Sequence, residues 1–145
     1  MEVKISDFGL AVHKNDGRSK NAYGTIEYSS PEVLRYEGCS SASDIWAVGV
    51  ILFNLVSRYL PFSGPSTGEV AERIKSCDYV ISESCDREAE IFIRKMFETD
   101  VPKRPNAAEC LNKDFIANHE IIVLEIIDDD PNEIFNVVLD EKVAD

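Results

Sequence analysis

The feature that most constrains this chain is an apolar stretch over residues 45–56, broken only by Asn54 and flanked by Asp44 and Arg58. A helix that crosses a bilayer needs about 20 apolar residues, so this stretch is too short to span a membrane. A helix that is apolar on every side is instead typical of the middle of a folded domain. We therefore predict a core helix over residues 41–57.

Shorter helical patterns surround this stretch. Ser30 followed by Pro31 and Glu32 predicts a brief helix, because serine is a common N-cap and proline is common at the first helical position. Apolar residues recur at helical spacing over residues 67–76 and 86–98, and another helix is predicted to start near residue 106. With one short strand predicted over residues 3–5, the fold class is mainly α.

Two pairs of polar residues predict how helices begin. Ser41 and Asp44 have the spacing of a capping box in which Asp replaces the usual Glu or Gln. Asn106 and Glu109 have the same spacing. We expect each pair to satisfy backbone N–H groups that a helix start leaves without partners.

Charge divides the chain into two parts. The net charge is −12, which opposes nucleic acid or an anionic membrane surface as the main partner. Residues 117–145 hold nine carboxylates and a single lysine, so most of the excess lies there. We predict a globular domain over residues 1–116 and an acidic C-terminal tail over residues 117–145. The tail is read either as a solvated linker or as a segment with a binding partner of its own.

The four cysteines (Cys39, Cys77, Cys85 and Cys110) form no CxxC pair and have no histidine at metal-ligand spacing. Reduced thiols in an intracellular protein are therefore expected. The first residues contain Glu2 and Lys4 and no apolar run, so no signal peptide is predicted. The expected location is intracellular, in the cytoplasm.

Five short motifs follow one another in order. They are Asp7-Phe8-Gly9, the run from Gly24-Thr25 to Ser30-Pro31-Glu32, Asp44-x-Trp46-x-x-Gly49, Pro61-Phe62 and Arg104-Pro105. Alone, any of them is weak: Asp7 could be a turn carboxylate and Thr25 a turn hydroxyl. Their order and spacing together are specific.

This series resembles the C-terminal lobe of a eukaryotic protein kinase from the Asp-Phe-Gly motif onward, over roughly residues 3–116. The "GVILFNLVSRYLPFSG" and "YGTIEY" runs are most similar to the calcium/calmodulin-dependent kinase group, with the myosin light chain kinase and titin-like branch as one option. The resemblance implies the helical lobe of the protein kinase-like (α+β) fold, without its N-lobe. It also implies ATP and Mg²⁺ as cofactors and a protein as substrate.

The resemblance assigns chemistry to the first motif and to the segment after it. Asp7 resembles the carboxylate that binds the Mg²⁺ on the nucleotide phosphates, a task for a hard oxygen ligand. Phe8 would pack beneath it, and Gly9 would allow the backbone to change direction. Thr25 resembles the threonine that contacts the catalytic loop in serine/threonine kinases. Ser19 is the candidate phosphorylation site, with a solvated loop hydroxyl as the alternative.

Three further residues are expected to hold the lobe together. Glu32 and Arg104 resemble a buried ion pair of the family, for which the planar guanidinium fork suits a carboxylate. Asp44 resembles the aspartate that accepts backbone N–H bonds from the catalytic loop, and it could equally be a helix cap.

The 145 residues contain no Gly-rich phosphate loop, no Val-Ala-Ile-Lys strand and no His-Arg-Asp catalytic loop. Those parts position the nucleotide and accept the substrate proton, so we expect no turnover from this chain alone. The alternative function is a non-catalytic, kinase-like module that binds partners.

Overall fold

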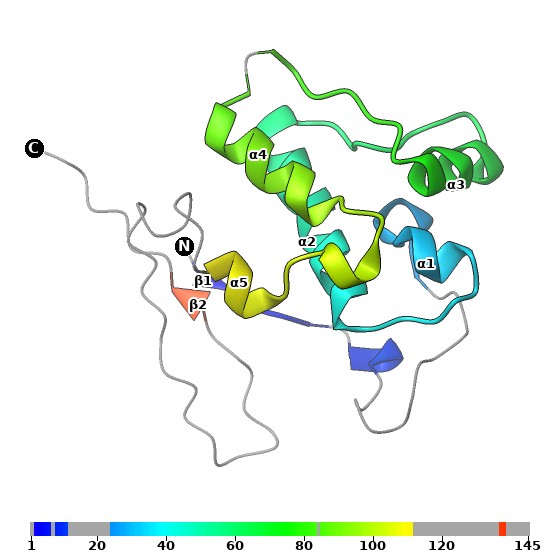
Figure 1. Ribbon diagram of the computed structural model, residues 1–145, viewed down its shortest axis with the longest axis horizontal. Coiled ribbons are helices and arrows are strands. Elements are labelled where there is room, and N and C mark those ends of the chain that lie inside the picture. Colours follow the sequence, from blue (N-terminus) through cyan, green and yellow to red (C-terminus); the bar gives the residue numbers. More distant parts are fainter. Residues whose placement is uncertain (1, 7, 12–23, 84, 112–136, 139–145) are drawn as a thin grey trace, which may run out of the picture.

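The computed structural model describes residues 2–6, 8–11, 24–83, 85–111 and 137–138 (Figure 1). This part of the chain is mainly helical, which confirms the predicted fold class. Its elements are, in chain order, β1 (Glu2–Val3), η1 (Phe8–Leu10), η3 (Ile26–Tyr28), α1 (Pro31–Leu34), α2 (Ser41–Ser57), α3 (Thr67–Ser76), α4 (Arg87–Met96), η4 (Val101–Lys103), α5 (Ala107–Leu111) and β2 (Val137–Val138).

Helix α2 lies at the centre of the core, as its apolar sequence predicts. It runs beside α4 in Figure 1, and the two helices pack against each other. The buried side of α2 carries Trp46, Val50 and Phe53, which are fully enclosed. The Trp46 ring stacks on Phe62 at 5.6 Å and meets Phe97 at 4.9 Å between ring centroids. The core is therefore an aromatic cluster built on one face of α2.

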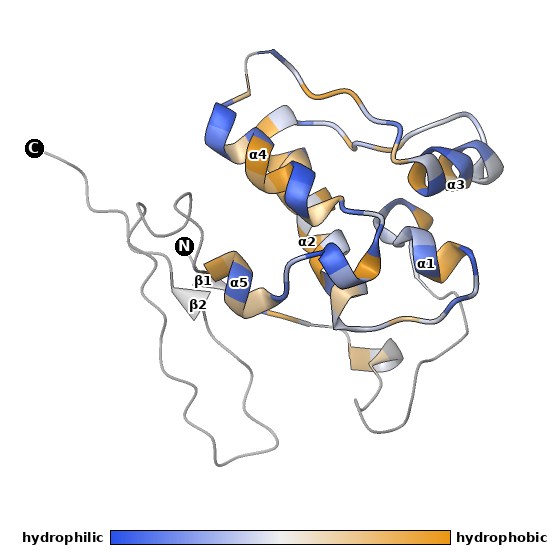
Figure 2. Cartoon of the chain, in the orientation of Figure 1, coloured by the Kyte–Doolittle hydropathy of each residue, from blue (hydrophilic) through white to orange (hydrophobic). Residues whose placement is uncertain are grey.

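The smaller helices cover this cluster with one face each. Figure 2 shows apolar and charged residues side by side along α4. Val70 and Ile74 of α3 are buried, as are Ala89, Phe92, Ile93 and Met96 of α4. Helix α3 in turn packs on α1 and η3. The helical periodicity predicted for both segments is confirmed.

The range of α2 agrees with the prediction, but its N-cap lies one residue earlier than predicted. Ser40 is the N-cap, and its partner in the capping box is Ser43 rather than Asp44. The Ser43 hydroxyl accepts the backbone N–H of Ser40 at 3.2 Å. Ser43, at the third helical position, thus accepts the N–H of the cap residue, a role that was predicted for Asp44. The predicted pairing of Ser41 with Asp44 was wrong.

The other predicted helix starts are confirmed. Ser30 is the N-cap of α1 and Pro31 its first residue. Asn106 and Glu109 exchange reciprocal side-chain-to-backbone hydrogen bonds of 2.9 Å at the start of α5.

Two-residue strands join the beginning and end of the described chain. β1 pairs antiparallel with β2, with Glu2 opposite Val138 and Val3 opposite Val137. The strand predicted over residues 3–5 is thus shorter and one residue earlier. Apart from β2, the acidic tail lies outside the described residues. None of the described helices has the length and apolar character needed to cross a membrane.

Gly49 allows α2 and α4 to approach closely. A Cβ atom at this position would lie 2.8 Å from the Cβ of Met96 and 3.0 Å from a ring atom of Phe97. The Met96 Cβ is fixed to the α4 backbone, so relief would require the helices to move apart.

We predict that Gly49→Ala destabilises the fold. Overpacking costs about 1–3 kcal/mol, which exceeds the gain of about 1 kcal/mol in helix propensity. Gly68→Ala in α3 is the matched control, because its added Cβ would meet only Ser66 Oγ, at 3.9 Å. Urea unfolding should show a lower midpoint for Gly49→Ala and an equal or higher one for Gly68→Ala. Equal midpoints for wild type and Gly49→Ala would contradict the close packing.

The four cysteines are free thiols. Cys77 ends α3 in the left-handed backbone region, and its thiol donates a hydrogen bond to the Phe97 carbonyl at 3.3 Å. Burial, followed by the negative charge of Glu98, raises the pKa of Cys77 to about 11. The reactive thiolate form of this residue is therefore scarce near neutral pH.

Cys77 should consequently resist alkylation. At pH 8 a thiol with a pKa near 11 is about one-thousandth thiolate, so labelling should be hundreds of times slower than for an ordinary thiol. Mass spectrometry after timed iodoacetamide treatment would compare Cys77 with the similarly half-buried Cys39. Labelling in urea is the control, since unfolding should make the two residues equivalent. Equal rates in the folded protein would refute the predicted protection.

Candidate functional site

The first motif is only partly described. Asp7 and Ser19 lie outside the described residues. Phe8 and Gly9 form the start of η1, and the Phe8 side chain is 59% exposed. Within the described part of the chain, Phe8 therefore has little apolar cover.

Thr25 lies at an exposed turn that is anchored to the hydrophobic core through Ile26. Gly24, just before it, has a φ of 96°, a conformation that favours glycine. Thr25 is the N-cap of η3, and its carbonyl accepts the Tyr28 N–H at 3.1 Å. Its hydroxyl makes no capping hydrogen bond. Ile26 packs against the aromatic core, so the core fixes the turn while the threonine side chain faces outward.

Glu32 and Arg104 meet inside the protein although 72 residues separate them. Two parallel hydrogen bonds join them, from Nη1 to Oε1 at 2.8 Å and from Nη2 to Oε2 at 2.9 Å. The Arg104 side chain is 0% exposed and that of Glu32 is 5% exposed. This bidentate geometry joins the end of the segment that contains Thr25 to the loop before α5.

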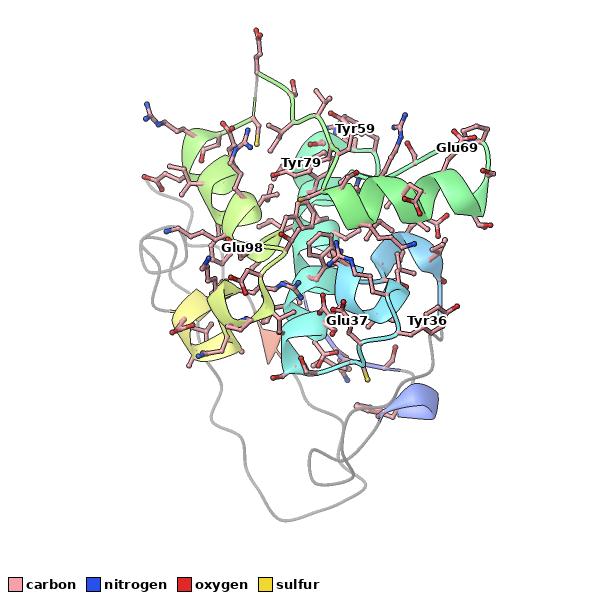
Figure 3. All side chains as sticks on the ribbon, turned by 45° about the vertical axis from the view of Figure 1, so that its right-hand side comes forward. Tyr36, Glu37, Tyr59, Glu69, Tyr79 and Glu98 are labelled. Carbon is pink, nitrogen blue, oxygen red and sulfur yellow. The ribbon has the colours of Figure 1, made fainter. Side chains whose placement is uncertain are left out.

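Two backbone carbonyls accept further hydrogen bonds from Arg104, and an aromatic ring lies beside its guanidinium group. Its Nε donates to the Glu98 carbonyl at 2.8 Å, and Nη1 also donates to the Ala42 carbonyl at 2.7 Å. Figure 3 labels Glu98, which lies in the turn after α4. The guanidinium carbon lies 5.1 Å from the centre of the Trp46 ring. The pair is therefore enclosed by α1, α2 and the turn after α4.

Opposing effects act on the Glu32 carboxyl. Burial by itself raises its pKa. The hydrogen bonds from Arg104, the hydrogen bonding of the Glu32 backbone and of the Ser30 side chain, and the positive charge of Arg104 together outweigh burial and hold the pKa below its usual value. Glu32 is thus more acidic folded than unfolded. Its contribution to stability is present above the unfolded pKa and is lost as the pH falls through the folded one.

Asp44 lies on a different side of α2. It is exposed, makes no ion pair with the described residues, and partial desolvation raises its pKa. Val48, Ile51 and Leu55 follow it at helical spacing, and they are 46%, 49% and 71% exposed. We call Asp44, Val48, Ile51 and Leu55 the open face of α2. A helix this apolar does not ordinarily leave such a face in water.

The sequence did not indicate two contacts of this site, although Trp46 belongs to one of the five motifs. Ser43 donates its hydroxyl proton to Glu32 Oε1 at 2.8 Å, and Trp46 provides the ring beside Arg104. The only signal for Ser43 was its position three residues after Ser40. No cluster of histidine, cysteine or acidic residues suited to a metal occurs among the described residues, from which Asp7 is missing.

Arg104→Met should destabilise the chain by about 3–5 kcal/mol, because it leaves the Glu32 charge buried without its partner. Arg94→Met is the control: Arg94 bonds to Glu90 at the surface, where ion pairs contribute about 0.2–1 kcal/mol. Urea unfolding at pH 7 measures both. A small loss for Arg104→Met, comparable with that of Arg94→Met, would contradict the assigned role of the buried pair.

Comparison with known proteins places these motifs in a family. The profile described as "Protein kinase domain" matches residues 1–116. Calcium/calmodulin-dependent protein kinase type I of Schizosaccharomyces pombe is 38% identical over 123 residues, which cover 80% of this chain and 37% of that protein. Serine/threonine-protein kinase plk-2 of Caenorhabditis elegans is 43% identical over 108 residues, covering 74% of this chain and 17% of that protein.

Myosin light chain kinase A of Dictyostelium discoideum is 36% identical over 126 residues, which cover 82% of this chain and 42% of that protein. The chain thus spans less than half the length of each of these relatives. The matched residues include all five motifs and both members of the buried pair. The chain therefore belongs to the protein kinase family, and its helical structure is consistent with the C-terminal lobe of a kinase domain related to serine/threonine kinases.

Proposed function

We propose that residues 1–116 are the C-terminal lobe of a serine/threonine protein kinase that transfers the γ-phosphate of ATP to protein hydroxyls. The observation that carries the proposal is the buried Glu32–Arg104 pair, which anchors the end of the segment beginning at Asp7. Phosphoryl transfer depends on positioning more than on covalent chemistry, so an anchored segment is what such a domain requires. The proposed setting is intracellular.

Asp7 is proposed to be the ligand of Mg²⁺, with Phe8 and Gly9 shaping the backbone around it. A carboxylate suits a hard cation, and glycine tolerates backbone angles that other residues avoid. The ion, when bound, would neutralise charge on the nucleotide phosphates. Support comes from the motif and from its place within the residues that match the family.

Thr25 is proposed to contact the catalytic loop of the complete domain. Its exposed side chain, its hydroxyl free of a capping bond and its core-anchored turn support this role. Ser19 is proposed as the phosphorylation site of the same segment. A phosphate there would add negative charge to a polar loop and would need cationic partners to order it.

The open face of α2 is the proposed contact surface for the parts of the domain that residues 1–145 do not contain. The carboxylate of Asp44 could accept backbone N–H groups of a catalytic loop, and the three apolar side chains below it would be buried against that part of the domain. Without the phosphate loop, lysine and catalytic loop, this chain by itself is proposed to be inactive. Residues 117–145 are proposed to be an acidic tail that binds a partner, although its strand β2 pairs with β1.

A chimera tests the activity. Residues 1–116 would replace the corresponding segment of the Schizosaccharomyces pombe calcium/calmodulin-dependent kinase. We expect the chimera to phosphorylate a serine- or threonine-containing peptide, whereas the 145-residue chain alone does not. Asp7→Asn in the chimera should lower kcat by about a hundredfold or more, as expected when a preorganised charge is removed from a transfer site. Transfer of ³²P from labelled ATP to the peptide measures the activity of the chimera, of its Asp7→Asn variant and of the 145-residue chain.

Glu88→Gln is the matched control, because Glu88 is an exposed carboxylate in the first turn of α4. It should leave kcat unchanged. A chimera that is folded and binds ATP but transfers no phosphate would contradict the proposal. It would favour the non-catalytic binding module, for which the open face of α2 is the candidate contact surface.

A further inference from the structure

The first turn of α2 contacts both members of the buried ion pair. The Ala42 carbonyl accepts Nη1 of Arg104 at 2.7 Å, and the Ser43 hydroxyl lies 2.8 Å from Oε1 of Glu32. An acceptor therefore faces the cation and a donor faces the anion, from adjacent residues of one turn. The turn is complementary to the ionised pair and would fit a neutral pair poorly.

The hydrogen bonds around Ser43 have a definite direction. A hydroxyl has one proton to donate, and its oxygen accepts the Ser40 N–H at 3.2 Å. The proton is then available for Oε1 of Glu32, which accepts it only while that oxygen carries no proton of its own. Such an arrangement continues from the Ser40 amide through Ser43 to the carboxylate, and each bond polarises the next. The bond to an ionised acceptor is the stronger kind.

We propose that Ser43 is a positioning residue that holds Glu32 ionised and locks the end of the segment from Asp7 to Glu32 to the first turn of α2. The consequence for phosphoryl transfer rests on the proposed function. Asp44, the next residue in this turn, is the residue proposed to contact the catalytic loop. Ser43 therefore links it to the end of the segment that contains Thr25. A small hydroxyl thereby sets the relative position of two parts of the site.

A second reading gives Ser43 the capping role alone. In that case its hydroxyl only accepts the Ser40 N–H, and the contact with Glu32 has no effect on the ionisation of that carboxyl. The two readings differ in the acidity of Glu32, which capping alone would not change. Arg104 is the charged side chain in contact with Glu32, and α2 contributes the uncharged Ser43, with Asp44 exposed on another side of the turn.

The experiment uses the complete 145-residue chain with ¹³C-labelled glutamate, and follows the Glu32 carboxyl signal by NMR as the pH is varied. Ser43→Ala should raise the titration midpoint of Glu32 by about one pH unit, a tenfold change in its acid dissociation constant, because a charge-assisted bond is lost. Ser43→Thr keeps a hydroxyl and should restore the wild-type midpoint. Ser41→Ala removes an exposed hydroxyl from the same turn and should have no effect.

Urea midpoints of the same variants give a second readout. The loss of unfolding free energy caused by Ser43→Ala should be largest at pH 7. It should shrink as the pH falls through the Glu32 titration, because wild type then loses more of its ion-pair stabilisation than the variant does. A loss of equal size at every pH, with an unshifted Glu32 midpoint, would overturn the proposal and leave Ser43 as a cap.

If Ser43→Ala does not fold, Ser43→Cys decides, because a thiol is a weaker hydrogen-bond donor than a hydroxyl. A cysteine variant that folds with a raised Glu32 midpoint supports the proposal, and one with the wild-type midpoint overturns it. No nucleotide or substrate is present in these measurements. The result for Ser43 is therefore independent of the chimera, and failure of either proposal can be told from failure of the other.

Discussion

The buried pair of Glu32 and Arg104 is the interaction on which the rest of the structure depends. Two parallel hydrogen bonds join residues from distant parts of the sequence, and α2 contacts both of them. Enclosing two charges is costly, and the cost is offset only where every donor and acceptor has a partner. The Glu98 and Ala42 carbonyls and the Ser43 hydroxyl supply three further partners for the pair. The pair therefore fixes where α1, α2 and the loop before α5 meet.

Helix α2 connects this junction to the core. Its first turn contacts the ion pair. Trp46 then connects the pair to the core, because its ring lies beside Arg104 and stacks on Phe62. Gly49, which has no side chain, then allows α4 to pack closely against α2. A displacement of the first turn would disturb the aromatic cluster as well, because tightly packed cores do not deform gradually. The junction and the core are in this sense one unit.

The open face of α2 gives the same helix a second role. Val48, Ile51 and Leu55 are as apolar as the buried side but remain in contact with water in this chain. Our proposal places the remainder of a kinase domain against this face, and Thr25 and Phe8 are exposed as well. The family match over residues 1–116 supports a kinase origin, and the activity itself remains our proposal.

The sequence by itself determined the helices and the family. The apolar stretch of α2, the N-caps Ser30 and Asn106 and the ordered motifs depend on neighbours a few residues apart, and such local relations can be read along a chain. Local reading failed at the start of α2, where Ser41 was predicted to be the cap but the neighbouring Ser40 is the N-cap, paired with a Ser43 whose hydroxyl also contacts Glu32. Only the tertiary structure showed Ser43 on Glu32, Trp46 beside Arg104 and one face of α2 without cover. Those facts depend on which distant segments meet, and the spacing of residues along the chain does not contain that information.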